Sequence, residues 1–123
     1  MDFSGHRHLK VYRLAYALAM EIYQVSKKFP NEERYSLTDQ IRRSSRSVAA
    51  NVAEAWRKRR YPAAFVNRLV EADGEATETQ VWLDFALGCG YVIRDDHARL
   101  MKRCEEIGRM LGGMLSYPER FSS

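Results

Sequence analysis

Apolar residues recur along this chain at alternating steps of four and three positions, the spacing that keeps one stripe of side chains on one face of an α-helix. The first such stretch precedes Pro30, and its stripe consists of Val11, Ala15, Leu18, Ile22, Val25 and Phe29. Three further stretches with this spacing follow, and no part of the chain shows the alternation typical of a β-strand. The pattern predicts an all-α protein with four helices.

Proline and capping residues bound the second helix. Because proline cannot continue a helix, Pro30 should end the first one, and Ser36 or Thr38 should cap the next. The second helix should end near Tyr61, since Pro62 restricts the backbone of the residue before it. Its core stripe is Leu37, Ile41, Ser44, Val48, Val52 and Ala55.

The third and fourth helices have similar boundaries. Pro62 suits the first position of a helix, and the glycines at positions 88 and 90 should end it. Asp95 or Asp96 should cap a fourth helix that stops before Pro118. The core stripes are Phe65, Leu69, Ala72, Ala76, Thr79, Leu83 and Leu87 in the third, and Leu100, Cys104, Ile107, Leu111 and Met114 in the fourth.

The 123 residues are enough for one domain with a core of ordinary size. Short connections between consecutive helices favour antiparallel neighbours, so we expect an antiparallel up-down-up-down four-helix bundle over residues 1–123. Its packed part should cover about residues 9–117, with flexible termini.

The third helix carries a second apolar stripe on the far side from its core positions. This stripe consists of Val66, Val70, Gly74, Thr77, Val81 and Phe85. On the second helix, Ala49, Ala50 and Ala53 lie opposite the core stripe and would let another helix approach closely. A helix that is apolar on two sides is either central in its own bundle or in contact with another subunit. Because each helix of a four-helix bundle keeps an outer face, we expect a homo-oligomer with these residues at the subunit interface.

Charge is distributed unevenly between the second and third helices. The formal net charge of the chain is +4. Residues 36–60 contain seven Lys or Arg and two acids, whereas residues 61–90 contain one Arg and five acids. Of these acids, Glu71, Glu75 and Glu78 lie beside the core stripe and are interpreted as a solvated or ion-paired edge. The asymmetry indicates either a basic surface for phosphate groups or two helices that attract each other within or between subunits.

The seven basic residues of the second helix are the strongest binding candidates. On a helical wheel Arg42, Arg46, Arg57 and Arg60 gather opposite the core stripe, Arg43 and Lys58 flank it, and Arg59 completes the set. The planar fork of arginine suits phosphate oxygens, and clustered cations release counterions on binding. A stripe on the first helix offers rings for stacking on unpaired bases, namely Tyr12, Tyr16 and Tyr23. The alternative is that the basic face is solvated or pairs with the acidic third helix.

Asn51 lies at the edge of the core stripe of the second helix, and Glu54 follows it about one turn later. A buried amide without hydrogen-bond partners costs about 1 to 3 kcal/mol. We therefore expect a structural role for both residues, with hydrogen bonds to another helix or subunit. A binding site that uses Asn51 is the alternative.

Residues that carry enzyme chemistry are sparse. The sequence lacks the common phosphate-loop, dinucleotide and hydrolase motifs, and it lacks the Glu-x-x-His pairs of a carboxylate di-metal centre. His6 and His8 lie in an N-terminus that we expect to be mobile, without further metal ligands nearby. Cys89 and Cys104 form no C-x-x-C pair and are interpreted as reduced, largely buried packing residues. We expect no catalytic residue, no metal site and no cofactor.

Neither a membrane span nor an export signal is apparent. No apolar run approaches the roughly 20 residues that a membrane span requires. The first ten residues contain no apolar signal-peptide core. We expect a cytoplasmic protein with no membrane partner.

The run FPNEERYSLTDQIRRSSRSVAANVAEAW, residues 29–56, resembles the pattern of the 23S rRNA intervening-sequence proteins, also called the S23 or four-helix bundle family. The matching residues are Phe29-Pro30, Glu32-Glu33-Arg34, Leu37-Thr38, Gln40-Ile41-Arg42-Arg43, Ser47-Val48 and Asn51-Val52-Ala53-Glu54. The resemblance continues more weakly to about position 115. Ala55 and Glu75 stand where the family has Gly and Ser.

The resemblance implies an antiparallel four-helix bundle that assembles into a ring-like homopentamer in bacteria, with no enzymatic activity. A relative is the accessory factor of diversity-generating retroelements, where a basic pentameric barrel binds nucleic acid and a reverse transcriptase. We therefore expect a non-enzymatic homo-oligomer that binds RNA or DNA through its basic surface, with a second protein as a further partner. The alternative is a structural or protein-interaction scaffold whose basic residues serve subunit pairing.

Overall fold

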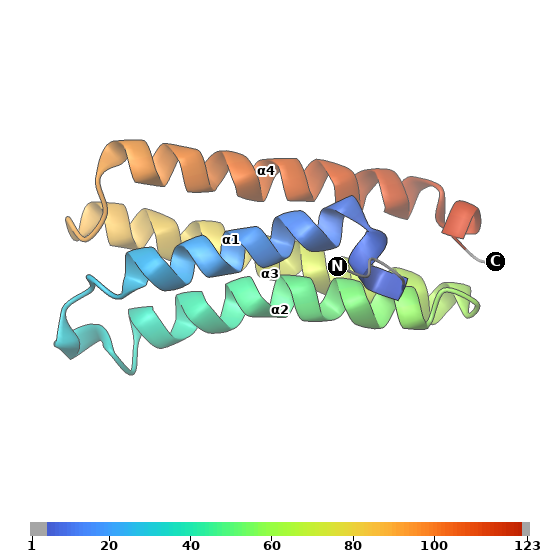
Figure 1. The fold of residues 1–123 in the computed structure, drawn as a ribbon, viewed down its shortest axis with the longest axis horizontal. Coiled ribbons are helices and arrows are strands. Elements are labelled where there is room, and N and C mark those ends of the chain that lie inside the picture. The colour runs from blue at the N-terminus through green and yellow to red at the C-terminus, as the bar shows by residue number, and fades with distance from the viewer. Residues whose placement is uncertain (1–4, 122–123) are drawn as a thin grey trace.

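The computed structural model describes residues 5–121, which form four long helices packed lengthwise (Figure 1). The helices are α1 (Lys10–Ser26), α2 (Leu37–Arg57), α3 (Pro62–Gly88) and α4 (Arg94–Ser116). Each helix runs opposite to the one before it, and α1 and α3 each pack against both α2 and α4. The predicted all-α four-helix bundle is confirmed.

The core lies where the four predicted apolar stripes meet. Phe65, Leu69 and Leu111 are each at most 1% exposed, and burial of such a side chain contributes about 1.5 to 3 kcal/mol. Val25 and Leu87 are half-buried at the margin of this core. All the other predicted core positions are buried.

Two buried hydroxyls join α2 to α3 inside the core. Thr79 Oγ1 donates to the carbonyl of Glu75 over 2.9 Å, and Ser44 Oγ lies 2.9 Å from Thr79 Oγ1. Both side chains are fully buried, so the pairing removes the cost of leaving either hydroxyl without a partner. The small residues at these positions therefore let α2 and α3 approach closely and still satisfy their polar groups.

The expected helix caps are wrong in detail. Ser36 immediately precedes α2, but its hydroxyl donates to Glu33 Oε1 over 2.6 Å and caps no backbone amide of α2. The same carboxylate oxygen accepts from the Leu37 amide over 3.4 Å, so it takes the role expected of the serine or of Thr38. Helix α4 begins at Arg94, which places both aspartates within its first turn, where they still favour the helix dipole.

A hydrogen bond between two loops closes one end of the bundle. Tyr91 Oη, in the loop between α3 and α4, donates over 2.9 Å to Glu33 Oε2 of the 3-10 helix η2 (Asn31–Glu33). This hydrogen bond raises the pKa of Tyr91 to about 12. The hydrogen bonds from Ser36 and then Tyr91 lower the pKa of Glu33.

The packed part of the chain extends past the expected range at both ends. The 3-10 helix η1 (Gly5–His8) contacts α1 and α2, with the His8 ring 4.8 Å from the Trp56 ring. The 3-10 helix η3 (Pro118–Phe121) places Phe121 5.8 Å from Phe65. The mobile N-terminus expected around His6 and His8 is therefore wrong for residues 5–8, because their rings pack on the bundle.

The two cysteines differ in their surroundings. Cys104 is 2% exposed, and burial raises the pKa of its thiol to about 12. Cys89 is exposed just after α3, so the expectation that it is a buried packing residue is wrong. Within residues 5–121, no helix combines the length and the apolar content needed to cross a membrane.

Candidate nucleic-acid interface

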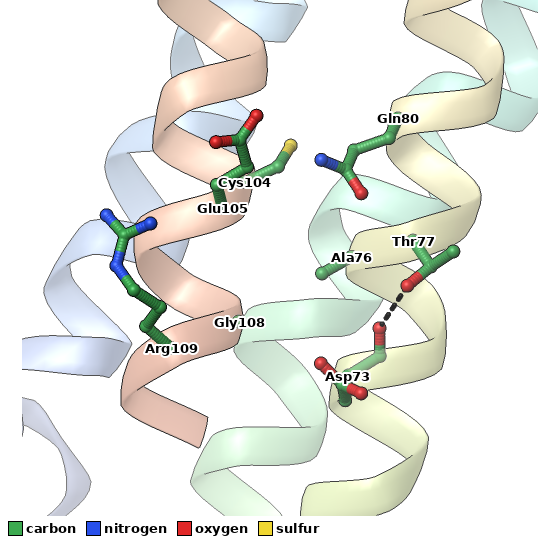
Figure 2. A pocket seen from close by; sticks show the side chains of 8 residues that line it. All are labelled: Asp73, Ala76, Thr77, Gln80, Cys104, Glu105, Gly108 and Arg109. Carbon is green, nitrogen blue, oxygen red and sulfur yellow. Dashed lines mark hydrogen bonds between the residues drawn. The ribbon is translucent and has the colours of Figure 1, made fainter. Parts of the chain in front are cut away.

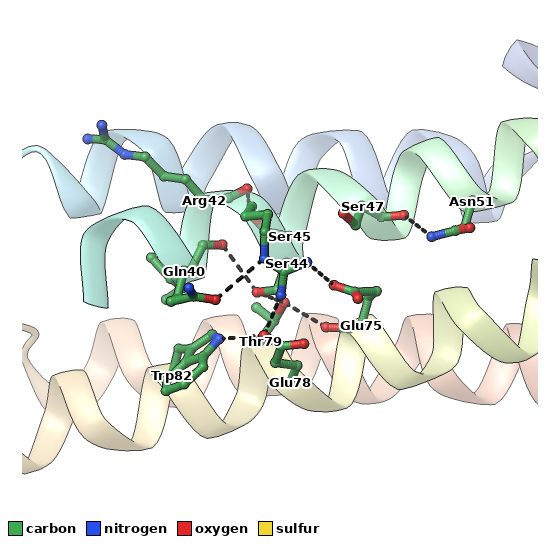
Figure 3. Close-up of polar contacts among 12 residues, drawn as sticks. Gln40, Arg42, Ser44, Ser45, Ser47, Asn51, Glu75, Glu78, Thr79 and Trp82 are labelled. Carbon is green, nitrogen blue, oxygen red and sulfur yellow. Dashed lines mark hydrogen bonds and ion pairs between the residues drawn. The ribbon is translucent and has the colours of Figure 1, made fainter. Parts of the chain in front are cut away.

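The basic residues of α2 have different neighbours, although they are close in sequence. Arg43 binds Glu75 and Glu78 of α3. Arg42 instead reaches toward α1 (Figure 3). The remaining basic run lies at the C-terminal end of α2, in the turn before Pro62. Of the predicted basic residues, Arg43 is therefore the one that the fold turns toward α3.

Arg43 is paired with acids of the same subunit. Its Nη2 lies 2.5 Å from Glu78 Oε1, and its Nη1 lies 3.3 Å from Glu75 Oε2. The hydrogen bond to Glu78 is the main cause that raises the pKa of Arg43. Trp82 Nε1 donates to the same Glu78 oxygen over 3.1 Å and holds that carboxylate in place (Figure 3). Arg43 thus joins α2 to α3, and it is a poorer phosphate ligand than the sequence predicts.

Arg42 and Arg46 lie on the other side of α2, around a tyrosine of α1. The Arg42 guanidinium carbon is 4.8 Å from the centroid of the Tyr23 ring, and that of Arg46 is 5.8 Å away. Lys27 Nζ is 4.8 Å from the same centroid. Because cations surround this ring, Tyr23 is not a free platform for base stacking, contrary to the prediction.

The other two tyrosines of the predicted stripe remain near the surface of α1. Tyr12 contacts the His6 ring at 4.7 Å and the Tyr16 ring at 6.4 Å, and Tyr16 is 54% exposed. Tyr16 is therefore the ring of this stripe that a base can reach most easily.

The basic run at the end of α2 forms, with η1, a basic end of the bundle. Arg57 and Arg60 are exposed, and Lys58 and Arg59 are half-buried. Arg59 stacks over Trp56 at 4.3 Å and donates from Nη1 to the Trp56 carbonyl over 3.0 Å.

A groove of about 440 Å³ lies between η1 and this part of α2. Its lining includes His6, Trp56, Arg57 and Arg59. The exposed Arg7 of η1 adds a further cation to the same end of the bundle. Sequence reasoning missed Arg7 and Trp56, because no periodicity links the segment before α1 to the end of α2.

Asn51 and Glu54 meet one arginine of the neighbouring helix. Arg68 of α3 donates from Nη1 to Asn51 Oδ1 over 3.4 Å, and its Nε lies 3.3 Å from Glu54 Oε2. Asn51 Nδ2 also donates to the Ser47 carbonyl over 2.9 Å. Both residues thus contact another helix, as their proposed structural role requires.

The second apolar stripe of α3 is open to solvent over most of its length. Val70, Val81 and Phe85 are 54%, 42% and 57% exposed, and Gly74 and Thr77 between them are also exposed. Val66 differs, since it is half-buried against the core.

Next to this α3 stripe, a groove of about 590 Å³ lies between the start of α2 and the end of α3. Its lining includes Leu37, Trp82, Phe85 and Cys89. The groove therefore extends the exposed apolar surface of the stripe toward α2.

The three alanines of α2 do not share one environment. Ala50 is exposed and Ala53 is half-buried, but Ala49 is only 9% exposed and belongs to the core. Placing Ala49 opposite the core stripe is therefore wrong, because the neighbouring helices enclose a wider arc of α2 than the wheel assumes.

A groove of about 380 Å³ between α3 and α4 holds several polar groups (Figure 2). Asp73, Gln80 and Cys104 line it, and Thr77 Oγ1 donates to the Asp73 carbonyl over 3.2 Å. The raised pKa of Cys104 keeps its thiol protonated at neutral pH, which makes it a poor nucleophile. Among residues 5–121, no cluster of three or more His, Cys, Asp or Glu could hold a metal ion.

Comparison with known proteins agrees with this architecture. Residues 7–113 match the family described as 23S rRNA-intervening sequence protein. A solved structure from Bacteroides thetaiotaomicron, described as a protein of unknown function from the S23 ribosomal protein family, is similar with a TM-score of 0.78 and 29% identity. The match covers 86% of this chain and 95% of that one. No curated protein matches. The chain therefore belongs to the 23S rRNA-intervening sequence protein family.

Proposed function

We propose that this protein is a non-enzymatic homo-oligomer, a ring-like pentamer as its family resemblance implies, that binds RNA or DNA through basic residues of α2. The observation that carries the proposal is the basic end of the bundle, where Arg57 lines a groove with η1 and both Arg57 and Arg60 are exposed. Among the described residues, no acid forms an ion pair with Arg57, Lys58 or Arg60. These cations are therefore available to phosphate groups.

The exposed α3 stripe supports self-association. Large apolar side chains such as Val70 and Phe85 lose contact with water when a second subunit covers them, at roughly 25 cal/mol per Å² of apolar surface. An oligomer would repeat the basic end in every subunit. Once one subunit has bound a nucleic-acid strand, binding of the same strand by the other subunits is intramolecular. Weak binding by one subunit therefore becomes appreciable binding by the assembly.

The proposed contacts are with the nucleic-acid backbone. Long arginine and lysine side chains on an outer surface reach phosphate oxygens more readily than base edges, so binding should tolerate many sequences. Within the tyrosine stripe of α1, the exposed Tyr16 is the candidate for an additional contact with an unpaired base.

A variant with Arg57, Lys58, Arg59 and Arg60 all replaced by serine tests the proposal. We expect its affinity for short single-stranded RNA to fall at least roughly tenfold and its salt dependence to flatten by about 3 in logarithmic slope. The matched control replaces four exposed cations elsewhere with serine, namely Lys28, Arg94, Lys102 and Arg109. Light scattering should give both variants the mass of the parent assembly.

A scaffold without nucleic-acid binding is the second candidate function. The observation that favours it is the use of Arg43 for pairing α2 with α3. Equal losses of affinity in the serine variant and in its control would reject the basic end as the binding site, and no binding of RNA by the parent protein would favour the scaffold.

A further inference from the structure

Three cations surround one aromatic ring at the junction of α1 and α2. Arg42 and Lys27 each place their charged group 4.8 Å from the centroid of the Tyr23 ring, and Arg46 places its own at 5.8 Å. We call Tyr23 and these three residues the Tyr23 cluster. Like charges held this close repel one another, so the cluster favours the binding of an anion.

No acid of the described chain neutralises the Tyr23 cluster. The one carboxylate on α1, Glu21, is turned toward α4, where Arg99 and Arg103 bind it at 3.2 and 2.8 Å. Asp39 lies about one turn before Arg42 on α2, but no ion pair between residues 5–121 involves it. By contrast, Arg43 and Arg68 each bind a carboxylate of the adjacent helix.

Arg42 is held in position by a buried hydroxyl. Its Nε donates over 2.8 Å to Ser26 Oγ, and Ser26 is only 2% exposed. The serine hydroxyl in turn donates to the Tyr23 carbonyl over 3.0 Å. Because Nε is occupied and Tyr23 lies against the guanidinium, the orientation of Arg42 is set before any ligand binds.

The two Nη groups of Arg42 remain for a ligand. Neither hydrogen-bonds to another described residue, and the side chain extends over α1, away from Glu75 and Glu78 (Figure 3). A guanidinium that presents two Nη groups can bind two oxygens of a phosphate or of a carboxylate, and the further cations beside it favour a chain of phosphates.

We propose that the Tyr23 cluster is a phosphate-binding site, occupied by a backbone phosphate of the bound nucleic acid. This inference rests on the proposed function, and it adds a second contact point to the basic end of the bundle. Arg46 and Arg57 are eleven residues apart on α2, about 16 Å along the helix axis, so one strand that follows α2 reaches both. Cations cover the ring of Tyr23, so the site reads phosphate and not base identity.

The test compares two double variants in binding to a fluorescent oligothymidylate. Replacing Arg42→Gln and Arg46→Gln together should lower the affinity roughly tenfold and flatten the logarithmic salt slope by about 1.4, the change expected for two lost phosphate contacts with a single strand. The control, Arg94→Gln with Lys102→Gln, removes the same charge from exposed positions on α4 and should change the affinity less than about twofold.

A third variant separates positioning from charge. Ser26→Ala removes the acceptor that holds Arg42 Nε and changes no charge, so it should weaken oligothymidylate binding severalfold. Unchanged binding by Ser26→Ala, or equal binding by the two double variants, would overturn the site. The proposed function would survive that result if the variant of residues 57–60 still lost binding.

Two further anions, inorganic pyrophosphate and polyglutamate, distinguish a phosphate-binding site from a surface for acidic proteins. At constant ionic strength, pyrophosphate should raise the Tm of the parent and of the α4 control but not that of the Arg42→Gln, Arg46→Gln variant. That result, with no binding of oligothymidylate or of single-stranded RNA by the parent, would support an anion site, overturn its nucleic-acid occupant and reject the proposed function. If the double variant lost polyglutamate binding and kept oligothymidylate binding, the cluster would be a surface for acidic proteins, and the inference would be wrong.

Discussion

At the scale of single residues, one arginine connects two polar positions of the neighbouring helix. Arg68 contacts both Asn51 and Glu54. We expect Asn51→Ala to lower the free energy of unfolding by about 1 kcal/mol, because the half-buried arginine loses an acceptor and the Ser47 carbonyl loses a donor. Urea unfolding followed by circular dichroism measures the change.

Asn67, which is exposed on α3, provides the matched control. Asn67→Ala should leave the midpoint of unfolding nearly unchanged. If Asn51→Ala kept the parent stability and lost only nucleic-acid binding, Asn51 would belong to a binding site and its structural role would be rejected.

The hydrogen bond between Tyr91 and Glu33 predicts a loss of stability in alkali. The pKa of Tyr91 is about 12 in the folded protein, against about 10 in an unfolded chain. The unfolded state therefore releases the phenol proton first, so this contribution is complete below about pH 10 and is lost as the pH rises toward 12.

Tyr91→Phe should remove this pH-dependent contribution to the free energy of unfolding. The difference in unfolding midpoint between the parent and Tyr91→Phe should shrink between about pH 10 and 12, whereas Tyr35→Phe, at a position 83% exposed, should show no such trend. In acid, the effect of pH on stability has the opposite sign, because the pKa of Glu33 is lowered in the folded protein. The contribution of Glu33 to stability is present above its unfolded pKa of about 4.3 and is lost as the pH falls through its folded pKa. A constant difference from pH 9 to 12 would contradict the assigned hydrogen bond.

At the scale of the elements, the α3 stripe is the feature that a lone bundle leaves unexplained. Val70→Glu together with Val81→Glu should reduce the mass measured by light scattering and preserve most of the helical circular dichroism, because both positions are exposed in one subunit. Leu69→Glu should unfold the subunit, because Leu69 is fully buried and an unpaired charge there is far more costly.

A charge-matched variant completes the comparison of the α3 stripe. Gln24→Glu with Ala98→Glu adds the same two charges at exposed positions on α1 and α4 and should retain the parent mass. A parent protein that is monomeric at micromolar concentration would refute self-association. A stripe variant with the parent mass would show that the contact lies elsewhere.

The helices themselves were predictable from sequence, because their apolar periods are long and proline or glycine stands at the ends. Pro62 opens α3 and Gly88 ends it, as predicted. The caps of α2 and α4 were not predictable in detail. A glutamate from the preceding turn competes successfully for the Leu37 amide, and the chain enters α4 before its aspartates.

The sequence predicted which basic residues make up the candidate site, but not which neighbouring helix each of them contacts. Arg42 and Arg43 are adjacent in sequence, yet one reaches α1 and the other binds acids of α3. A helical wheel gives angles around one helix and does not say which neighbour lies on each side. For the same reason it placed Ala49 outside the core, where the structure buries it.

At the scale of the whole molecule, the opposite charges of α2 and α3 are partly neutralised within the subunit. The ion pairs of Arg43 of α2 with Glu75 and Glu78 of α3 cross between these two helices. Two basic regions remain, namely the basic end at residues 57–60 and the Tyr23 cluster nearer the start of α2. Among the described residues, no acid forms an ion pair with Arg57, Lys58, Arg60 or a cation of the Tyr23 cluster. Basic surface thus persists where no ion pair within the described residues binds Arg42, Arg46, Arg57 or Arg60.

The salt dependence of nucleic-acid binding is the decisive measurement of whether this protein binds phosphate groups. The affinity of the unmodified protein for two short RNAs of unrelated sequence is measured by fluorescence anisotropy from about 50 to 200 mM salt. We expect binding to both RNAs. Because phosphate contacts release counterions, the logarithm of the affinity should fall linearly against the logarithm of the salt concentration, with the same steep slope for both. No binding at about 50 mM salt, or an affinity that salt does not change, would contradict this prediction.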